Sequence, residues 1–211
     1  MLVNSPKAVF LSLPTTAQVQ EVCKELIATS TEAGLVVIDC TSGDAAASEG
    51  LTKLLAEAGH HYVESPVSGG PRGAAAGSVT AMIAGHNQQA REFALEVVRS
   101  SYCSRGGLAV DLGGTPGAAH ATKAVNNGLN AAHLLLGTEA LAGLQAVYEV
   151  PAADALRAIN ASSGRSLQTQ VRLPEEVLSR RFQYNFALGL MKKDSLNAAK
   201  ILRAADRTGG T

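Results

Sequence analysis

The sequence predicts an α/β fold in which a small parallel sheet with helices on its faces is followed by an all-helical part. Up to about residue 113, short apolar runs alternate with stretches of helical periodicity, which is typical of strands and helices in turn. The runs are apolar almost throughout, as expected of parallel strands that are buried on both faces. After that point the patterns are helical only.

Each expected strand is a short, mainly apolar run. The runs occupy residues 7–13, 35–39, 62–64, 78–84 and 108–112. Pro14 ends the first strand, and a capping-box pattern, Thr15 followed three residues later by Gln18, predicts the start of the first helix. Asp44 can cap the second helix. A third helix is expected at residues 87–100.

One long helix is expected next. Thr115 can cap it, and Pro116 fits its first turn, where a missing N–H is tolerated. The next proline is Pro151, so the helix can continue to about Tyr148. A helix of roughly 30 residues is about 45 Å long, which is the length of an element that links two domains.

The rest of the chain reads as shorter helices. They are expected at residues 151–160, 174–181 and 186–206. We therefore expect two domains, residues 1–113 and residues 114–211, that share the long helix.

The long helix carries a stripe of polar residues. Lys123, Asn127 and Asn130 recur at helical spacing, and Asn126 lies beside them in an otherwise small and aliphatic segment. Asparagine is a poor helix former, so three within five residues favour a functional site. The alternative is the solvated face of an ordinary amphipathic helix.

A glycine-rich segment at residues 65–77 directly follows an expected strand. Open parallel sheets bind ligands at the carboxyl ends of their strands, and adjacent glycines let backbone N–H groups approach a carboxylate or phosphate. A flexible connection is the alternative. Two further segments, residues 162–165 and residues 192–194, are ambiguous by themselves.

Composition excludes several classes of partner. The 211 residues carry 18 basic and 18 acidic side chains and no basic run, so nucleic acid and anionic membrane are not expected partners. The three cysteines form neither a disulfide framework nor a zinc pattern. No apolar run approaches the roughly 20 residues of a membrane span. We expect the protein in the cytoplasm or the mitochondrial matrix.

Taken together and in order, these segments resemble the β-hydroxyacid dehydrogenase family, which includes 3-hydroxyisobutyrate dehydrogenase and is related to 6-phosphogluconate dehydrogenase. The matching segments run along nearly the whole chain: Leu13-Pro14-Thr15, Asp39-Cys40-Thr41-Ser42, Pro66-Val67-Ser68-Gly69-Gly70 with Gly73-Ala74 and Gly77, Lys123 with Asn126-Asn127, Ser162-Ser163-Gly164-Arg165, and Lys193-Asp194. The resemblance implies a partial Rossmann-like domain that binds NAD or NADP. It also implies a helical domain that carries the catalytic lysine and forms dimers or tetramers.

The resemblance also implies roles for single residues. Lys123 corresponds to the catalytic residue. The substrate carboxylate is expected at Ser68, Gly69, Gly70 and Asn127. The cofactor is expected near Leu13, Pro14, Thr15, Thr41 and Lys193, with Asp194 supporting the last contact. No metal is implied.

These residue types suit the oxidation of a small 3-hydroxy acid. A hydroxyl proton must be removed as hydride leaves the same carbon for the nicotinamide. A buried lysine amine can accept that proton, because burial lowers the pKa of lysine. An oligomerising scaffold without catalysis and an inactive truncated product are the alternatives.

The family begins with a strand and a Gly-x-Gly-x-x-Gly turn that cradles the dinucleotide pyrophosphate. This sequence has no such turn. Met1 therefore corresponds to a position inside the family's first domain, and Thr211 to one before the last helical segment. From this we expect a chain that is truncated at both ends and that binds the cofactor poorly by itself.

Overall fold

The computed structural model describes residues 8–30, 32–184 and 186–207. Residue 7, which the sequence assigns to the first strand, lies outside them. Three parallel strands form the first sheet, in the order β1-β2-β3: β1 (Ala8–Leu11), β2 (Val36–Asp39) and β3 (His61–Glu64). All three end at the same edge, because parallel strands run in one direction.

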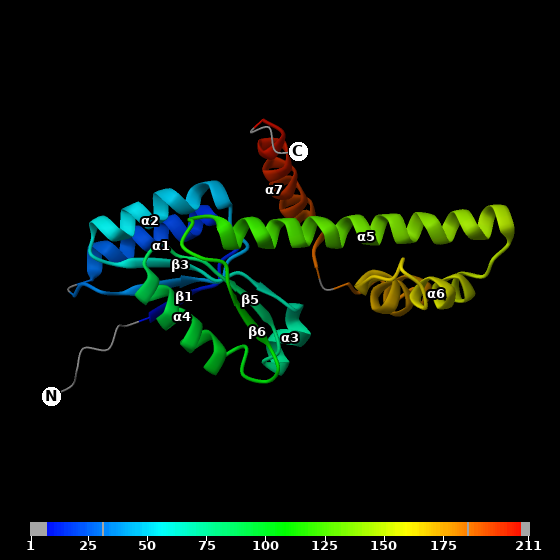
Figure 1. Cartoon of the computed structure of the whole chain (residues 1–211), viewed down its shortest axis with the longest axis horizontal. Helices are drawn as coiled ribbons and strands as arrows, with labels where there is room; N and C mark the ends of the chain where they lie inside the picture. The colour runs from blue at the N-terminus through cyan, green and yellow to red at the C-terminus, as the bar shows by residue number, and fades with distance from the viewer. Residues whose placement is uncertain (1–7, 31, 185, 208–211) are drawn as a thin grey trace. The chain divides into compact units, whose positions relative to one another are not determined.

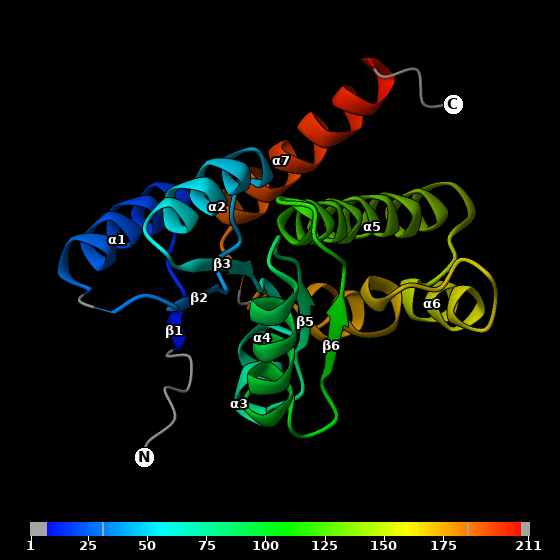
Figure 2. The same ribbon diagram turned by 60° about the vertical axis from the view of Figure 1, so that its left-hand side comes forward.

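A second sheet has the order β4-β5-β6, with β4 (Val67–Ser68), β5 (Thr80–Ile83) and β6 (Leu108–Asp111). β5 and β6 are parallel, and lie side by side in Figure 2, but β4 pairs with β5 in the antiparallel sense. An antiparallel bridge between Glu64 and Ala84, with N–O distances of 2.8 and 3.1 Å, joins the two sheets. The expected wholly parallel sheet is therefore mixed.

The glycine-rich segment at residues 65–77 is more regular than a loop. It holds β4 and a short helix, α3 (Gly70–Ala76). Gly69 and Gly70 have φ angles of 142° and 61°, which L side chains rarely adopt. The chain can therefore turn from β4 into α3 within two residues.

Helices cover both faces of the first sheet. Figure 1 shows α1 (Thr16–Thr29) and α2 (Ser48–Glu57) on one face and α4 (Gln88–Ser100) on the other. A short 3₁₀ turn, η1 (Ala45–Ala47), precedes α2. Asn87 caps α4 by accepting a hydrogen bond from the N–H of Ala90 (2.9 Å). The asparagine before an apolar helical pattern is a typical start signal.

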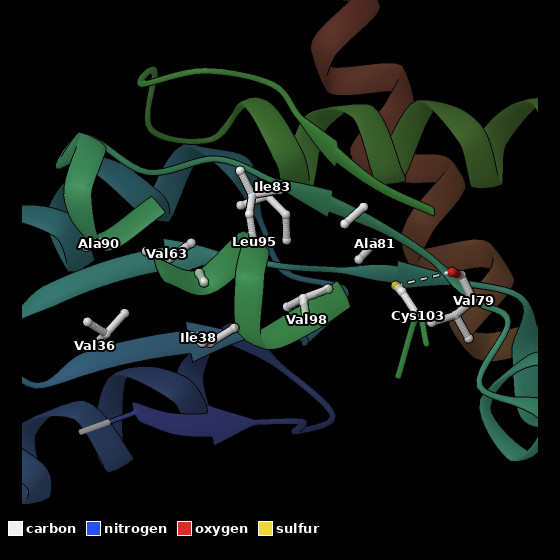
Figure 3. Packing of buried hydrophobic residues seen from close by; sticks show 12 residues of the cluster. Val36, Ile38, Val63, Val79, Ala81, Ile83, Ala90, Leu95, Val98 and Cys103 are labelled. Atoms are coloured by element: carbon white, nitrogen blue, oxygen red, sulfur yellow. Dashed lines mark hydrogen bonds between the residues drawn. The ribbon is translucent and has the colours of Figure 1, made fainter. Parts of the chain in front are cut away.

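Neighbouring strand residues face opposite cores. Val37 of β2 packs with residues of α1 and α2, whereas Val36 and Ile38 pack with α4. The core on the α4 side includes residues of both sheets, and Figure 3 shows it at close range with Cys103 donating to the carbonyl of Val79 (3.3 Å). This two-sided burial explains why the strands are apolar throughout.

The remainder is helical, as α5 (Ala118–Tyr148), α6 (Ala152–Asn160), η2 (Gln168–Leu178) and α7 (Leu188–Arg207). Leu141 of α5, Leu156 of α6 and Leu173 of η2 are buried in one core. η2 begins earlier than the helix expected at residues 174–181 and is π-helical. Pro174 lies inside it and has no N–H to donate to a regular helix.

The chain divides into two compact units, Met1–Ala124 and Val125–Thr211. The boundary lies within α5, eleven residues beyond the expected one at residue 113, and each unit is described by itself below. The predicted class, a small sheet with helices followed by a helical part with one long shared helix, is confirmed. Among the described helices, none is long and apolar enough to cross a membrane.

Candidate functional site

The side chain of Glu64, at the end of β3, holds the first turn of α5. Its carboxylate is 1% exposed and accepts hydrogen bonds from the backbone N–H groups of Gly117 (2.5 Å), Ala119 (3.1 Å) and His120 (3.0 Å). A carboxylate is favoured there, because helix N-termini carry partial positive charge and unpaired N–H groups. The side-chain cap therefore comes from Glu64 and not, as predicted, from Thr115.

Gly117 makes this arrangement possible. Its φ is +90°, and a Cβ atom on this residue would lie 2.7 Å from the carbonyl oxygen of Ala45. A side chain would therefore be strained and would also collide with backbone. The start of α5 can pack against η1 because position 117 is glycine.

A second buried carboxylate, that of Asp39 at the end of β2, lies in a hydrogen-bonded network. The hydroxyl of Tyr62 donates to its Oδ2 (2.7 Å), and the N–H of Thr41 donates to its Oδ1 (2.9 Å). Nε2 of His120 lies 3.2 Å from the Tyr62 hydroxyl and 3.6 Å from Asp39 Oδ2. These four side chains are at most 3% exposed, so the network is sealed from bulk water.

The network shifts the pKa values of Asp39 and Tyr62 in opposite directions. Burial by itself raises the pKa of Asp39, but hydrogen bonds and charge from His120, with hydrogen bonds from Thr41 and Tyr62, outweigh it and leave that pKa below its ordinary 3.8. Burial first, and the Asp39 charge second, raise the pKa of Tyr62 well above 10. Tyr62 therefore keeps its proton and donates it to an ionised Asp39.

Lys123 follows His120 by one turn of α5 and is 8% exposed. Asn127, one further turn along the same helix, is 7% exposed, and Asn126 and Asn130 are half-buried. The stripe is thus not the solvated face of an amphipathic helix. Lysine is rarely buried to this extent, so its position in the second turn of α5 requires a reason.

The residues expected near the cofactor in the first unit follow β1 and β2. The N–H of Leu13 donates to the hydroxyl of Thr41 (3.1 Å), which joins the two strand ends. Pro14 and Thr15 are exposed, and the side chain of Gln18 accepts from the N–H of Thr15 (3.2 Å) at the start of α1. The structure thus gathers these four residues at the carboxyl edge of the first sheet.

The expected carboxylate-binding residues, Ser68 to Gly70, lie at the turn from β4 into α3. Ser68 is half-buried and paired with Thr80, whereas Gly69 and Gly70 are exposed. Among the described residues, no hydrogen bond links this turn to Leu13 or Thr41. The structure therefore places Ser68, Gly69 and Gly70 together but does not join them directly to the residues expected near the cofactor.

In the second unit, Asp194 of α7 connects two of the predicted residues. Its Oδ2 accepts from the amide nitrogen of Asn127 (2.7 Å), and its Oδ1 lies 3.3 Å from Nζ of Lys193. Asp194 is 4% exposed. Close approach of the helices allows this, since a Cβ atom at Gly128 would lie 2.9 Å from that of Ala198.

Other polar residues of the second unit were only partly predicted from the sequence. Asn130, a member of the stripe, contacts Gln168 of η2 and donates to the hydroxyl of Tyr184 (3.2 Å). The expected loop at residues 162–165 is exposed, and no hydrogen bond among the described residues links its serines or Arg165 to this group.

Sequence reasoning missed Glu64, Tyr62 and His120 as partners of the α5 start. One signal was available: Asp39 and Glu64 are acidic residues that end buried apolar strands. A charge in that position needs a partner. Which residue is the partner could not be predicted, because the contacts join residues more than fifty positions apart in the sequence.

Comparison with known families agrees with this architecture. Residues 1–100 match the NAD-binding domain of 6-phosphogluconate dehydrogenase, and residues 117–208 match the family described as NAD-binding of NADP-dependent 3-hydroxyisobutyrate dehydrogenase. Both are nicotinamide-dinucleotide families, so the cofactor class is NAD or NADP.

One relative with a known activity is similar to most of this chain. The chain is 31% identical over 195 residues to 2-(hydroxymethyl)glutarate dehydrogenase of Eubacterium barkeri, covering 88% of this chain and 60% of that protein. It therefore spans less than two thirds of this relative.

Solved structures share the fold. Mycobacterium tuberculosis 3-hydroxyisobutyrate dehydrogenase with L-serine has a TM-score of 0.81 at 24% identity, covering 97% of this chain and 68% of that one. The protein Psf3 in complex with NADP⁺ and 2-OPP has a TM-score of 0.75 at 26% identity, covering 92% and 66%. By the two family matches, this relative and the shared fold, the chain belongs to the β-hydroxyacid dehydrogenase family.

Proposed function

We propose that the protein is an NAD(P)-dependent dehydrogenase of the 3-hydroxyisobutyrate dehydrogenase type, which oxidises a small 3-hydroxy acid reversibly. The observation that carries the proposal is the burial of Lys123 on a helix whose preceding turn is held by Glu64 and by the Asp39 network. The relative from Eubacterium barkeri supports the substrate class, since the hydroxymethyl group in its name places the hydroxyl one carbon beyond the α-carbon.

Lys123 is the proton acceptor in this proposal. In the oxidation direction its neutral amine takes the hydroxyl proton, while the C–H bond of the same carbon breaks and its electron pair leaves as hydride. Lys123 becomes an ammonium, and a carbonyl forms on the substrate. In reduction the ammonium returns the proton. When bound, the nicotinamide supplies the hydride acceptor.

The other residues position the substrate. Ser68 and the backbone N–H groups of Gly69 and Gly70 hold its carboxylate, because these groups donate hydrogen bonds without adding charge. Asn127 orients the substrate through the part of its amide that Asp194 leaves available. Asp194 itself keeps the amide of Asn127 in one orientation.

The residues at the strand ends fit a dinucleotide. The hydrogen bond between Leu13 and Thr41 brings together two loops at the carboxyl edge of the parallel sheet, where dinucleotides bind in such folds. Leu13, Pro14, Thr15 and Thr41 would hold it there. In the second unit, Lys193 would contact the cofactor, and its ion pair with Asp194 limits the directions in which its amine can point.

The test is turnover by a Lys123→Ala variant. NADH or NADPH formation from 3-hydroxy acids is measured for the protein, for this variant and for Lys53→Ala, an exposed lysine paired with Glu57. Loss of a general acid–base group lowers kcat by about 10²–10⁴-fold, and Lys53→Ala should be unchanged. Circular dichroism checks that both variants fold. A folded Lys123→Ala variant with normal kcat would refute the role of Lys123.

A scaffold function is the second candidate, and it rests on exposed apolar side chains in the second unit. Leu135, Leu136 and Leu188 are 62%, 65% and 79% exposed, and exposed apolar surface is common where a partner binds. Homodimers or homotetramers would cover it. Light scattering after gel filtration gives the oligomeric state, and a stable oligomer without any turnover would favour the scaffold over the dehydrogenase.

A further inference from the structure

His120 connects the buried strand ends to the part of α5 that carries Lys123. It lies in the first turn of this helix, three residues before Lys123, and both residues belong to the first unit. Residues at this spacing lie on one face of a helix, with Cβ atoms about 5–6 Å apart. His120 is 2% exposed, so water does not compete for the hydrogen bonds of its ring.

The hydrogen bonds around the ring can be assigned a direction. The hydroxyl of Tyr62 donates its proton to Asp39 Oδ2 (2.7 Å), so its oxygen can only accept from His120. Nε2 of His120 lies 3.2 Å from this oxygen and must therefore carry a hydrogen. The result is a chain of hydrogen bonds that runs from His120 through Tyr62 to the carboxylate at the end of β2.

The face of the same ring is covered by Gly43. A Cβ atom on this residue would lie 3.0 Å from Cε1, 3.1 Å from Nε2 and 3.2 Å from Nδ1 of His120, so the glycine backbone packs directly against the ring. Nδ1 is buried and has no hydrogen-bond partner among the described residues. The polar contacts of the ring are therefore made at Nε2, and their loss would leave it held by packing alone.

This side-chain contact constrains the helix in a way that the Glu64 cap does not. Backbone N–H groups at a helix start point along the helix axis, so Glu64 mainly fixes the position of α5 along that axis. The hydrogen bond of His120 lies off the axis and fixes the rotation about it. An atom about 6 Å from the axis moves by about 1 Å when the helix rotates by about 10°, and a 1 Å misplacement can lower a rate about 100-fold.

We propose that His120 is a positioning residue for Lys123. Its ring, held by Tyr62 and Asp39, fixes the rotation of the α5 start and with it the direction of the lysine side chain. This rests on the proposed function, which assigns proton transfer to Lys123. His120 contributes a hydrogen-bond donor at Nε2 and not an acid or a base, so a neutral donor at the same place should be able to replace it.

The test compares two replacements of His120. Glutamine can place an amide N–H near the position of Nε2, whereas leucine fills similar space without a donor. His120→Leu should lower kcat about tenfold or more with KM within about twofold, because Lys123 is misplaced while substrate binding is retained. In His120→Gln, kcat should stay within about threefold of the unchanged protein. His133→Leu, at an exposed position of α5, is the matched control and should leave both constants unchanged.

Two further variants separate placement of Lys123 from a general loss of stability. Tyr62→Phe interrupts the same chain by a change on β3 and should also lower kcat. Combined with His120→Leu, its effect should be smaller than the product of the two single effects. Val19→Ala creates a cavity in the core of the first unit, where Val19 is fully buried, and destabilises the fold. Its kcat should be unchanged.

A second readout does not need turnover. In protein that is isotope-labelled at the ε carbon of lysine, the two ε protons of a side chain held in one direction have different NMR shifts, whereas fast rotation averages them. The Lys123 signal is assigned by its loss in Lys123→Ala. It should be split in the unchanged protein and in His120→Gln, and unsplit in His120→Leu.

The proposal would be overturned by a folded His120→Leu variant with unchanged kcat and an unchanged Lys123 signal, by equal losses in His120→Gln and His120→Leu, or by an unsplit signal in the unchanged protein. Should His120→Leu fail to fold, normal kcat and a split signal in Tyr62→Phe would overturn it equally. Turnover that depends on Lys123 would then still support the dehydrogenase. Conversely, a Lys123 signal that depends on His120 in a protein without turnover would support the positioning role and contradict the proposed function.

Discussion

Oε1 of Glu64 lies 2.5 Å from the backbone nitrogen of Gly117, so a strand end supplies the cap of the longest helix. Two more N–H groups of the same helix turn share this carboxylate. One buried carboxylate thus satisfies three N–H groups that would otherwise be buried at the helix start without an acceptor. The stability of the first unit should therefore depend strongly on Glu64.

Replacement of Glu64 by alanine should lower the free energy of unfolding by about 3–5 kcal/mol, because buried N–H groups lose a charged acceptor. Urea denaturation followed by circular dichroism measures it. Glu57→Ala is the control, since Glu57 is exposed and its pair with Lys53 is 3.9 Å long. That variant should change stability by less than about 1 kcal/mol. Equal effects of the two changes would contradict the capping role.

Two glycines of the α5 region should respond to alanine in opposite directions. Gly117→Ala should destabilise by at least about 1–3 kcal/mol, because its φ is +90° and its Cβ would meet the carbonyl of Ala45. Gly143 lies inside α5, and a Cβ atom there would have nothing within 4 Å. Gly143→Ala should therefore stabilise by about 0.5–1 kcal/mol. Thermal unfolding of both variants tests the pair, and a stabilising Gly117→Ala would refute the close approach.

The lowered pKa of Asp39 predicts how stability changes with acid. Because the folded pKa lies below the ordinary 3.8, the ionised carboxylate stabilises the fold fully above that pH, and this contribution disappears as the pH falls through the folded pKa. The difference in unfolding free energy between the protein and Asp39→Asn should be constant near neutral pH and shrink below about pH 4. Asp154→Asn, at an exposed ion pair, should show little change. A difference that grows on acidification would contradict the assignment.

The thiols should be unreactive in the folded protein. Burial, and then the charge of Asp39, raise the pKa of Cys23 to about 11, so about one thiol in a thousand is ionised at pH 8. Burial also raises the pKa of Cys40 and Cys103. Iodoacetamide labelling with peptide mapping should find all three slow, and Cys23 slowest, until urea is added. Rapid labelling of Cys23 in the folded state would show that its surroundings open readily.

The sequence was sufficient for elements whose signals are local. The helix at Gln88–Ser100 follows its Asn87 cap, and the long helix ends at Tyr148, shortly before Pro151. The antiparallel β4 was missed because two residues are too short to show any period. The start of η2 was predicted too late. Proline is common at the first position of a helix, but here the helical segment begins before Pro174 and continues through it.

In the candidate site, too, only the features with a local sequence signal were predicted. The burial of Lys123 and Asn127 was suggested by their small and aliphatic neighbours. The role of Glu64 as the acceptor for the α5 start was not predicted. Its contacts with this helix form only when the end of β3 packs against the start of α5. Tyr184 and Gln168 gave no periodic signal at all, because they lie in or after the irregular η2. Roles assigned to single residues by resemblance stay predictions.

The cap on α5 also has a consequence for the order of folding. Glu64 and Gly117 are 53 residues apart, so the chain must close a long loop before the helix start gains its acceptor, which slows the step. During synthesis the ribosome releases β3 first. The strand can therefore be seated in its sheet before the helix emerges, and the turn before Lys123 would be among the last parts of the first unit to become ordered.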